Sequence, residues 1–183
     1  ENMVLNEVSS CRKRLNSMGI DNNGIIIVHG GGTYGNKEDT IRRWIEQYDD
    51  LPKIVKDRLV IENCERQYSV SDCIHISDEC GIPVVFDFHH HDCYCNIHKI
   101  EEKYPIDVLP SIVNTWGDRK VVMHVSEQGE GRIGHHSDYI ERIPDSLLEL
   151  LEENEDLKID LEVEAKMKEL AINKLYKKYD KLF

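Results

Sequence analysis

Residues 84–93, VVFDFHHHDC, join an apolar run directly to a cluster of polar side chains. The apolar half is rich in the β-branched and aromatic residues that favour strands. Asp87 and the histidines at positions 89–91 offer the oxygen and imidazole groups that bind metal ions. A surface histidine cluster needs no apolar run before it, and a core strand does not favour four polar residues at its end. The combination therefore predicts a strand that ends at the rim of an active site.

Four further apolar runs share this character, being rich in valine and isoleucine without clean alternation. Runs of this kind predict parallel strands that are buried on both faces. The five predicted strands span residues 25–29, 58–62, 83–88, 120–125 and 158–164. Helix-like stretches separate and flank them at residues 7–18, 37–51, 71–80, 107–117, 144–154 and 165–179. The alternation predicts an α/β protein with a parallel sheet under helical cover.

Each predicted strand ends in a side chain that can bind a metal ion. These side chains are His29, Glu62, Asp87, His124 and Glu164. One falls in each βα unit of roughly 30 residues, at the carboxyl end, where (β/α)8 barrels carry their active sites. A doubly wound open sheet would instead concentrate its ligands at one switch point. We therefore expect a (β/α)8 TIM-barrel type of α/β fold, to which this chain contributes about five βα units. Residues 1–183 would form a single, incomplete barrel domain whose upstream strands are missing or come from elsewhere.

The residues around these strand ends indicate which groups would bind metal. A carboxylate that follows a buried Leu-Val-Ile run, as Glu62 does, must be paired, protonated or bound to metal. Asp87 and His90 lie just beyond one strand and can direct their side chains into one pocket. We expect His89 and His91 to point elsewhere, as supporting or surface groups, because neighbouring residues alternate in direction on extended chain.

Two further segments add candidate ligands. The loop GHHSDY (134–139) offers two histidines, and Glu162 shares a face with Glu164 but lies deeper in its strand. Oxygen and imidazole ligands without a thiolate suit Mn, Zn, Fe or Co rather than a sulfur-bound structural metal. The candidates outnumber the ligands that one ion needs, so we expect two or three divalent ions. Closely spaced ions are suited to phosphodiester hydrolysis.

Other motifs give weaker signals. VHGGGTYGNKE (28–38) lacks the spacing of a nucleotide-binding loop, and its glycines more simply allow a tight turn past a crowded site. HDCYCNIH (91–98) lacks the cysteine spacing of a zinc finger or ribbon. No GxSxG motif supports a serine nucleophile.

The composition bounds the class of protein. No run approaches the roughly 18 apolar residues of a membrane span, and we expect an intracellular protein, of cytoplasm or nucleus, with reduced cysteines. The net charge of −12 argues by itself against a nucleic-acid-binding face. A metal site would remove this objection to nucleic-acid binding, because bound divalent cations invert the local electrostatics of clustered carboxylates.

Six segments in their order along the chain resemble the UV-damage endonuclease family. They are VHGGGTYGNKE, RLVIEN, GIPVVFDFHHH, MHVSEQ, HSDY and EVEAKMKELA, and the resemblance extends over nearly the whole chain. That family is a metal-dependent TIM barrel related to endonuclease IV. The resemblance implies a DNA repair enzyme that nicks damaged double-stranded DNA immediately 5′ of ultraviolet photoproducts and other lesions, usually with manganese. It also implies a protein that is a monomer when complete.

The resemblance implies metal-binding roles for seven residues, and it selects His136 over His135. The seven are His29, Glu62, Asp87, His90, His124, His136 and Glu164. Glu62 would bridge two ions, and Glu62 and Asp87 would be the catalytic residues, acting through water bound to the metal. The expected metal is Mn2+, with Zn2+ or Co2+ as alternatives.

The sequence departs from the family pattern in two places. The amino-terminal strands of the family, which carry further histidine ligands and the residues that probe damaged bases, have no counterpart here. The family lysine two residues before the strand histidine of MHVS, which can be carboxylated, is Val122 in this chain, and the nearest lysine is Lys120. Two alternatives therefore stay open: a sugar isomerase or epimerase built on the same kind of metal-binding barrel, and a non-catalytic remnant that binds metal.

Overall fold

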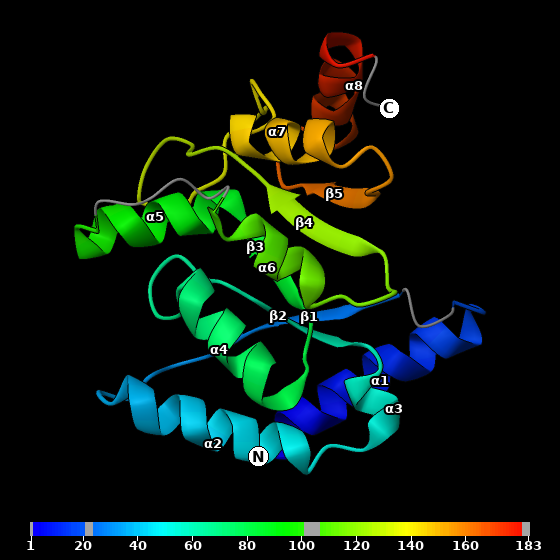
Figure 1. Ribbon diagram of the computed structural model, residues 1–183, viewed down its shortest axis with the longest axis vertical. Coiled ribbons are helices and arrows are strands. Elements are labelled where there is room, and N and C mark those ends of the chain that lie inside the picture. The colour runs from blue at the N-terminus through cyan, green and yellow to red at the C-terminus, as the bar shows by residue number, and fades with distance from the viewer. Residues whose placement is uncertain (1, 21–23, 101–106, 181–183) are drawn as a thin grey trace.

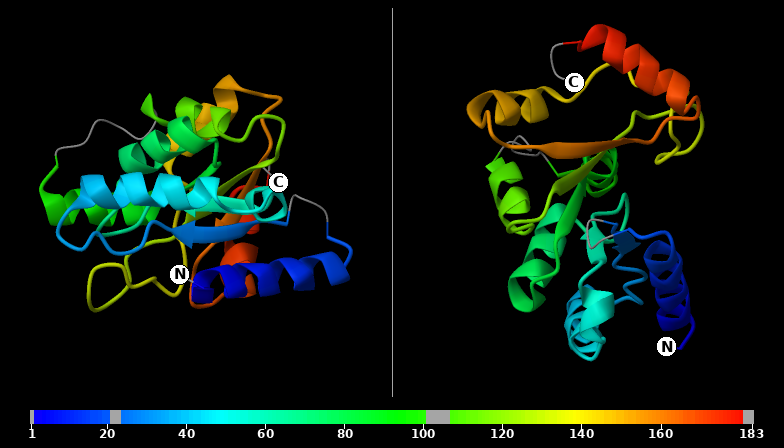
Figure 2. Two further views of the ribbon diagram at one scale, coloured as in Figure 1. Left: turned by 90° about the horizontal axis from the view of Figure 1, so that it is seen from below. Right: turned by 90° about the vertical axis from the view of Figure 1, so that its right-hand side faces the viewer.

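The computed structural model describes residues 2–20, 24–100 and 107–180 and contains one sheet of five parallel strands (Figure 1). The strands are β1 (Ile26–His29), β2 (Leu59–Glu62), β3 (Val84–Asp87), β4 (Val121–Val125) and β5 (Ile159–Val163). They lie in the order β1-β2-β3-β4-β5, and every neighbouring pair is parallel. All five strands lie within the predicted ranges. Within the described part of the chain β1 and β5 are edge strands, so the sheet is open (Figure 2).

Eight helices cover or flank this sheet in the described residues. They are α1 (Asn2–Ser17), α2 (Lys37–Asp49), α3 (Lys53–Lys56), α4 (Val70–Cys80), α5 (Phe88–His98), α6 (Leu109–Asn114), α7 (Asp145–Glu153) and α8 (Glu169–Lys178). Each of the six predicted helical stretches overlaps one of them, although α1 begins five residues before the predicted stretch. Two helices were not predicted from the sequence: α3, which is a single turn, and α5. Three of the buried residues of α5 are successive histidines, so polar side chains lie on its buried side as well as at the exposed Asp92 and Asn96, and no amphipathic period marks the helix.

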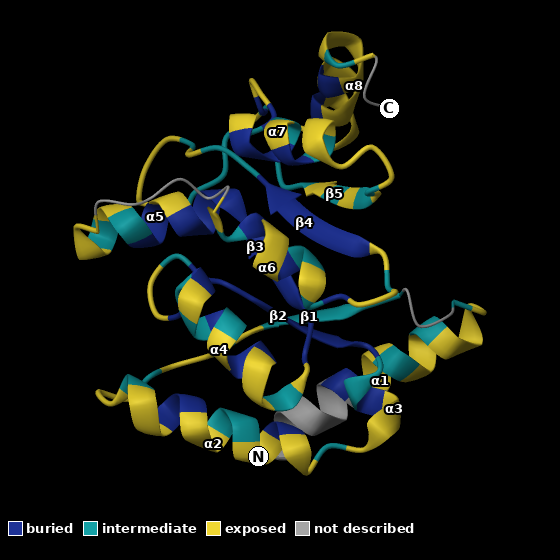
Figure 3. Cartoon of the chain, in the orientation of Figure 1, coloured by how far each residue is buried: buried dark blue, intermediate teal, exposed yellow. Residues whose placement is uncertain are grey.

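The two faces of the sheet have different roles. Strands β2, β3 and β4 are buried throughout, as expected for strands that are covered on both faces (Figure 3). Ile61, Phe86 and Met123 alternate with the polar strand-end residues, so they lie on the opposite face, and each is fully buried. The polar residues share the other face, because the register pairs His29 with Glu62 and Asp87 with His124.

The end of β3 differs from the sequence-based expectation. Asp87 is the N-cap of α5, and its Oδ1 accepts a hydrogen bond from the backbone N–H of His90 at 2.7 Å. Phe88 therefore begins a helix rather than ending the strand, and our argument from extended chain for the histidines was wrong. His89 and His91 do diverge from His90 on this helix, but both are buried, so neither is a surface group.

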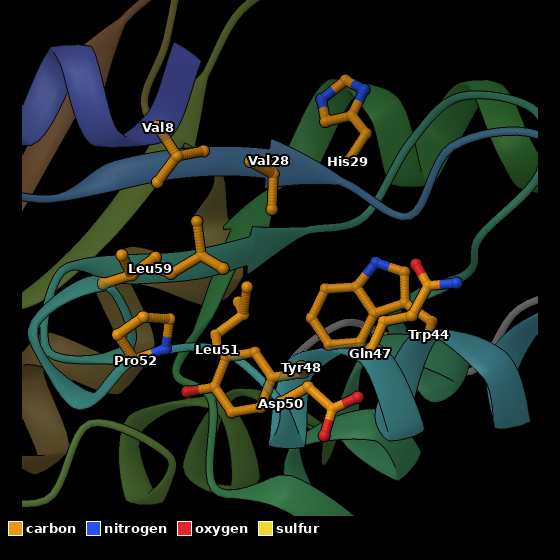
Figure 4. Close-up of a pocket in the computed structure, with 11 residues that line it drawn as sticks. Val8, Val28, His29, Trp44, Gln47, Tyr48, Asp50, Leu51, Pro52 and Leu59 are labelled. Carbon is orange, nitrogen blue, oxygen red and sulfur yellow. The ribbon is translucent and has the colours of Figure 1, made fainter. Parts of the chain in front are cut away.

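An apolar pocket of about 330 Å3 lies against β1 and α2, on the side of the strand away from the polar face. Val28 points into it between Trp44 and Leu59, whereas the imidazole of His29 points away (Figure 4). Of the seven predicted metal-binding residues, only His29 lines this pocket. None of the helices in the described ranges is long and apolar enough to span a membrane.

Candidate metal centre

The carboxyl ends of the strands bring together all seven of the predicted metal-binding residues. They form three overlapping groups in which the candidate ligand atoms lie within 4.8 Å of one another. The groups are His29, Glu62 and His90; Glu62, Asp87 and His124; and His90, His136 and Glu164. Glu62 and His90 each belong to two groups, so the three groups form one continuous cluster.

Glu62 lies at the centre of this cluster. Its Oε2 is 2.9 Å from His29 Nε2, and its Oε1 is 3.2 Å from the Nδ1 atoms of both His90 and His124. Burial alone would raise the pKa of Glu62, but contacts with His124, His29 and His90 outweigh it and lower the pKa well below its usual range. Glu62 is therefore ionised, and each of its two oxygens faces different candidate ligands, as a bridging carboxylate requires.

Asp87 supplies a buried carboxylate oxygen without a hydrogen-bond partner. Its side chain is fully buried, and Oδ1 caps α5 while Oδ2 receives no hydrogen bond from any described residue. Oδ2 lies 3.7 Å from His90 Nδ1 and 3.9 Å from His124 Nδ1. Burial raises the pKa of Asp87 to about 6. An unsatisfied oxygen in this position is costly unless a proton or a cation accompanies it.

Asn63 holds Asp87 and His90 in place. Its side-chain amide accepts a hydrogen bond from the backbone N–H of Asp87 and donates one to the carbonyl of the same residue, both at 2.9 Å. The backbone carbonyl of Asn63 lies 3.1 Å from His90 Nδ1. A histidine that donates from Nδ1 to a carbonyl presents the lone pair of Nε2 to a cation. The sequence analysis missed Asn63, for which its place beside Glu62 was the only signal.

His124 is buried among carboxylates. Its Nδ1 lies 3.8 Å from Glu164 Oε1 in addition to the contacts with Glu62 and Asp87, and its Nε2 lies 3.2 Å from Glu162 Oε2. Burial would lower the pKa of His124, but contacts with Glu162 and Glu62 raise it to about 10. A carboxylate on the second nitrogen fixes the orientation of a metal-binding imidazole. Glu162 was not among our predicted site residues, although the strand register pairs it with His124.

The loop that follows β4 contributes His136 rather than His135. His136 Nε2 is 3.5 Å from Glu164 Oε2, and its ring centroid lies 5.9 Å from that of the buried His89. His135 faces its own loop, where Nε2 accepts a hydrogen bond from Arg132 Nε at 3.0 Å. The choice of His136 as a candidate ligand therefore agrees with the geometry, and His89 lies beside it as a supporting group.

The position of the family lysine is occupied by an apolar side chain. Val122 is buried on the same strand face as His124. Lys120 lies two residues before Val122, further from the carboxyl end of β4, and forms an ion pair with Asp160. It therefore does not replace the family lysine. The strand β4 thus brings only His124 to the cluster.

The donor set fits divalent cations. It consists of carboxylate oxygens and imidazole nitrogens, and the six cysteines, all free thiols, take no part in the three groups. Hard oxygen and imidazole donors suit Mn, Zn, Fe and Co. The orphaned Oδ2 of Asp87 and the ionised, buried Glu62 are the features that a bound cation would stabilise.

Comparison with known proteins identifies the family. The model of the UV-endonuclease UvdE family matches residues 2–182. The UV DNA damage endonucleases of Bacillus velezensis and Bacillus mycoides are 33% and 34% identical, each over 88% of this chain and 50% of their own length. The chain thus spans about half the length of the curated relatives it matches.

A solved structure supports the same relationship. SacUVDE superposes with a TM-score of 0.78 and 32% identity, covering 96% of this chain and 57% of SacUVDE. This likeness, together with the consecutive order of five parallel strands, confirms the expected TIM-barrel type of α/β fold. The chain belongs to the UV-endonuclease UvdE family.

Proposed function

We propose that this protein is a metal-dependent DNA repair endonuclease that hydrolyses the phosphodiester 5′ to ultraviolet photoproducts and other lesions. The observation that carries the proposal is the cluster at the strand ends, in which Glu62 joins two groups of candidate ligands. Family membership supports damaged double-stranded DNA as the substrate. The protein would act inside the cell, as a monomer.

Two or three divalent ions, with Mn2+ as the expected metal and Zn2+ or Co2+ as alternatives, would be held by these groups. Glu62, Asp87 and His124 would hold the first, with Glu164 beside them, since His124 Nδ1 lies within 4 Å of all three carboxylates. The second would lie by His29 and Glu62 and the third by His136 and Glu164, and Nε2 of His90, left free because Nδ1 faces the Asn63 carbonyl, would bind one of the two. Such ions lower the pKa of a water molecule and neutralise charge on the phosphodiester.

The protein residues of the site have separate tasks. Glu62 is ionised in its buried position, so it supplies negative charge that two cations can share. Asp87 offers a buried Oδ2 without a hydrogen-bond partner, and its pKa, which burial raises to about 6, would fall when a cation binds there, so it would bind as a carboxylate. Asn63 and Glu162 position Asp87 and His124 through the contacts described above. Because the cluster is already assembled, binding needs little reorganisation.

The test is a nicking assay with the full-length protein loaded with manganese. We expect conversion of ultraviolet-irradiated supercoiled plasmid to open circles, little nicking of untreated plasmid, and loss of activity in Glu62→Gln and Asp87→Asn. His75→Ala is the matched control, because His75 is an exposed histidine of α4 outside the three groups. Folded, manganese-loaded protein that leaves irradiated plasmid intact would contradict the proposal. Binding of manganese without nicking would identify a non-catalytic metal-binding protein, and turnover of a ketose would identify a sugar isomerase.

A further inference from the structure

Tyr34 is presented to solvent at the mouth of the site. It is 89% exposed and lies in the loop 30–36, between His29 at the end of β1 and the start of α2. This loop lies at the same end of the sheet as α5 and the loop after β4 (Figure 1). Tyr34 also has a positive φ of 49°, a conformation that is strained for a bulky residue.

The loop around Tyr34 is held by hydrogen bonds, so looseness of the chain does not account for this exposure. The carbonyl of Thr33 accepts hydrogen bonds from Asn36 N and from Thr40 Oγ1, both at 3.0 Å. Thr33 Oγ1 donates to Gln67 Oε1 in the loop after β2, at 2.7 Å. The two loops are therefore joined at the residue that precedes Tyr34.

An exposed cation lies in the second of these loops. Arg66 is the residue before Gln67, and its side chain is 54% exposed. Its backbone carbonyl accepts a hydrogen bond from His98 Nε2 at 2.8 Å, and its Nε lies 3.7 Å from Glu65 Oε1. Lys37, by contrast, is engaged by Asp72 and by the hydroxyl of Tyr94, at 2.7 and 3.0 Å. At this part of the rim, Arg66 is thus better placed than Lys37 to meet an anion.

We propose that Tyr34 and Arg66 form a nucleic-acid contact site outside the metal cluster, in which Tyr34 stacks on a DNA base and Arg66 binds a neighbouring phosphate. The proposal rests on the proposed function, because it takes the substrate to be DNA. Stacking on an aromatic ring needs no particular base and no charge, whereas the guanidinium adds an ionic contact. A neutral stacking contact suits a chain of net charge −12, whose charge opposes the approach of DNA.

The backbone strain distinguishes Tyr34 from an ordinary exposed aromatic residue. Single exposed apolar residues are common and need no explanation. A glycine would adopt a φ of 49° without strain, yet this position has a side chain whose ring contacts little beyond the neighbouring Gly32. Strain at a residue that gains so little packing points to a role in binding.

The experiment measures the affinity and its salt dependence for irradiated duplex DNA, using full-length protein in which calcium replaces manganese to prevent nicking. Loss of one stacked base weakens binding by roughly 5- to 150-fold, so we expect Tyr34→Ala to bind about tenfold more weakly with an unchanged salt slope. Tyr34→Phe should bind as the wild type does. Arg66→Gln should instead reduce the slope of log K against log salt by about one. Tyr176→Ala, which alters an exposed tyrosine on α8, is the control and should leave binding unchanged.

The outcomes separate this inference from the proposed function. If wild-type protein neither binds nor nicks irradiated DNA, the proposed function fails, and this inference fails with it. If wild-type protein nicks irradiated DNA but Tyr34→Ala binds as tightly as Tyr176→Ala does, the stacking role alone is overturned. Tyr34→Gly should be no less stable than the wild type, because glycine tolerates the backbone conformation. A large fall in melting temperature for Tyr34→Gly, with normal DNA binding, would show that the ring packs within the protein and would also overturn the inference.

Discussion

Replacing Gly30 by alanine tests how tightly the loop after β1 is packed above the core. A Cβ atom on Gly30 would lie 2.6 Å from three ring atoms of Tyr68. Ordinary carbon contacts begin near 3.5 Å, so the loop and the ring must separate by roughly 0.9 Å. Tyr68 is fully buried, so its ring has little room to move. Overpacking of this kind costs about 1–3 kcal/mol in the free energy of unfolding.

Gly32→Ala is the matched control for this substitution. Its Cβ would meet only the exposed ring of Tyr34, at 3.4 Å, so it creates no serious overlap. Both variants lose the flexibility of one glycine in the unfolded chain, which stabilises each by up to about 1 kcal/mol where the backbone allows it. The difference between the two variants therefore isolates the overlap with Tyr68.

The assay is urea unfolding of the chelated proteins, so that metal binding does not contribute to stability. We expect Gly30→Ala to be less stable than Gly32→Ala by about 1–3 kcal/mol, which lowers the melting temperature by ~2–4 °C for each kcal/mol in a chain of this size. The penalty should shrink when Tyr68 is replaced by leucine, since the two positions are in contact. Equal unfolding midpoints for Gly30→Ala and Gly32→Ala would refute the reasoning.

Three further predictions concern the metal centre. Glu62→Gln should reduce bound metal, measured by elemental analysis after dialysis, more than His91→Ala does, because Glu62 joins two groups whereas His91 packs against Phe86; equal occupancy would contradict the assignment. Asp87→Asn should lower the nicking rate by at least ~100-fold but change DNA affinity only a few-fold, since phosphate contacts come mainly from other groups; nicking near the wild-type rate would oppose this. Metal affinity should rise from about pH 6 to about pH 9, because protons compete with cations for the imidazoles of His90 and His124. In the metal-free protein the pKa values of these two groups are raised to about 9 and about 10. Calorimetry that shows weaker binding as the pH rises would contradict this prediction.

Strands β2, β3 and β4 could be predicted because burial on both faces leaves a clear trace in the sequence, whereas β1 and β5 are only partly buried. Val84, Val85 and Phe86 form a continuous apolar run and are fully buried, as expected for a strand that is covered on both faces. Parallel order then places all carboxyl ends at one end of the sheet, so polar strand-end residues could be grouped without coordinates. Helix α5 could not be recognised because its buried side carries three histidines, so polar residues lie on both sides of the helix and no amphipathic period appears.

The supporting residues of the site were harder to predict because their roles depend on register and on loop geometry. Glu162 contacts His124 only because β4 and β5 pair those two residues side by side. Asn63, which follows β2, forms hydrogen bonds with the backbone of Asp87 at the end of the neighbouring strand β3. No spacing in the sequence predicts this contact. The loop that carries Tyr34 is joined at Thr33 to Gln67, in a second loop that lies far away in the sequence.

The central claim is that Glu62 joins two metal sites at the carboxyl ends of the strands. Anomalous diffraction at the manganese edge, from crystals of the full-length protein soaked in manganese, tests it most directly. We expect anomalous peaks on both sides of the Glu62 carboxylate, one shared with Asp87 and His124 and the other with His29. Well-ordered crystals with saturating manganese and no peak at Glu62, or with peaks only at other places on the protein, would contradict it.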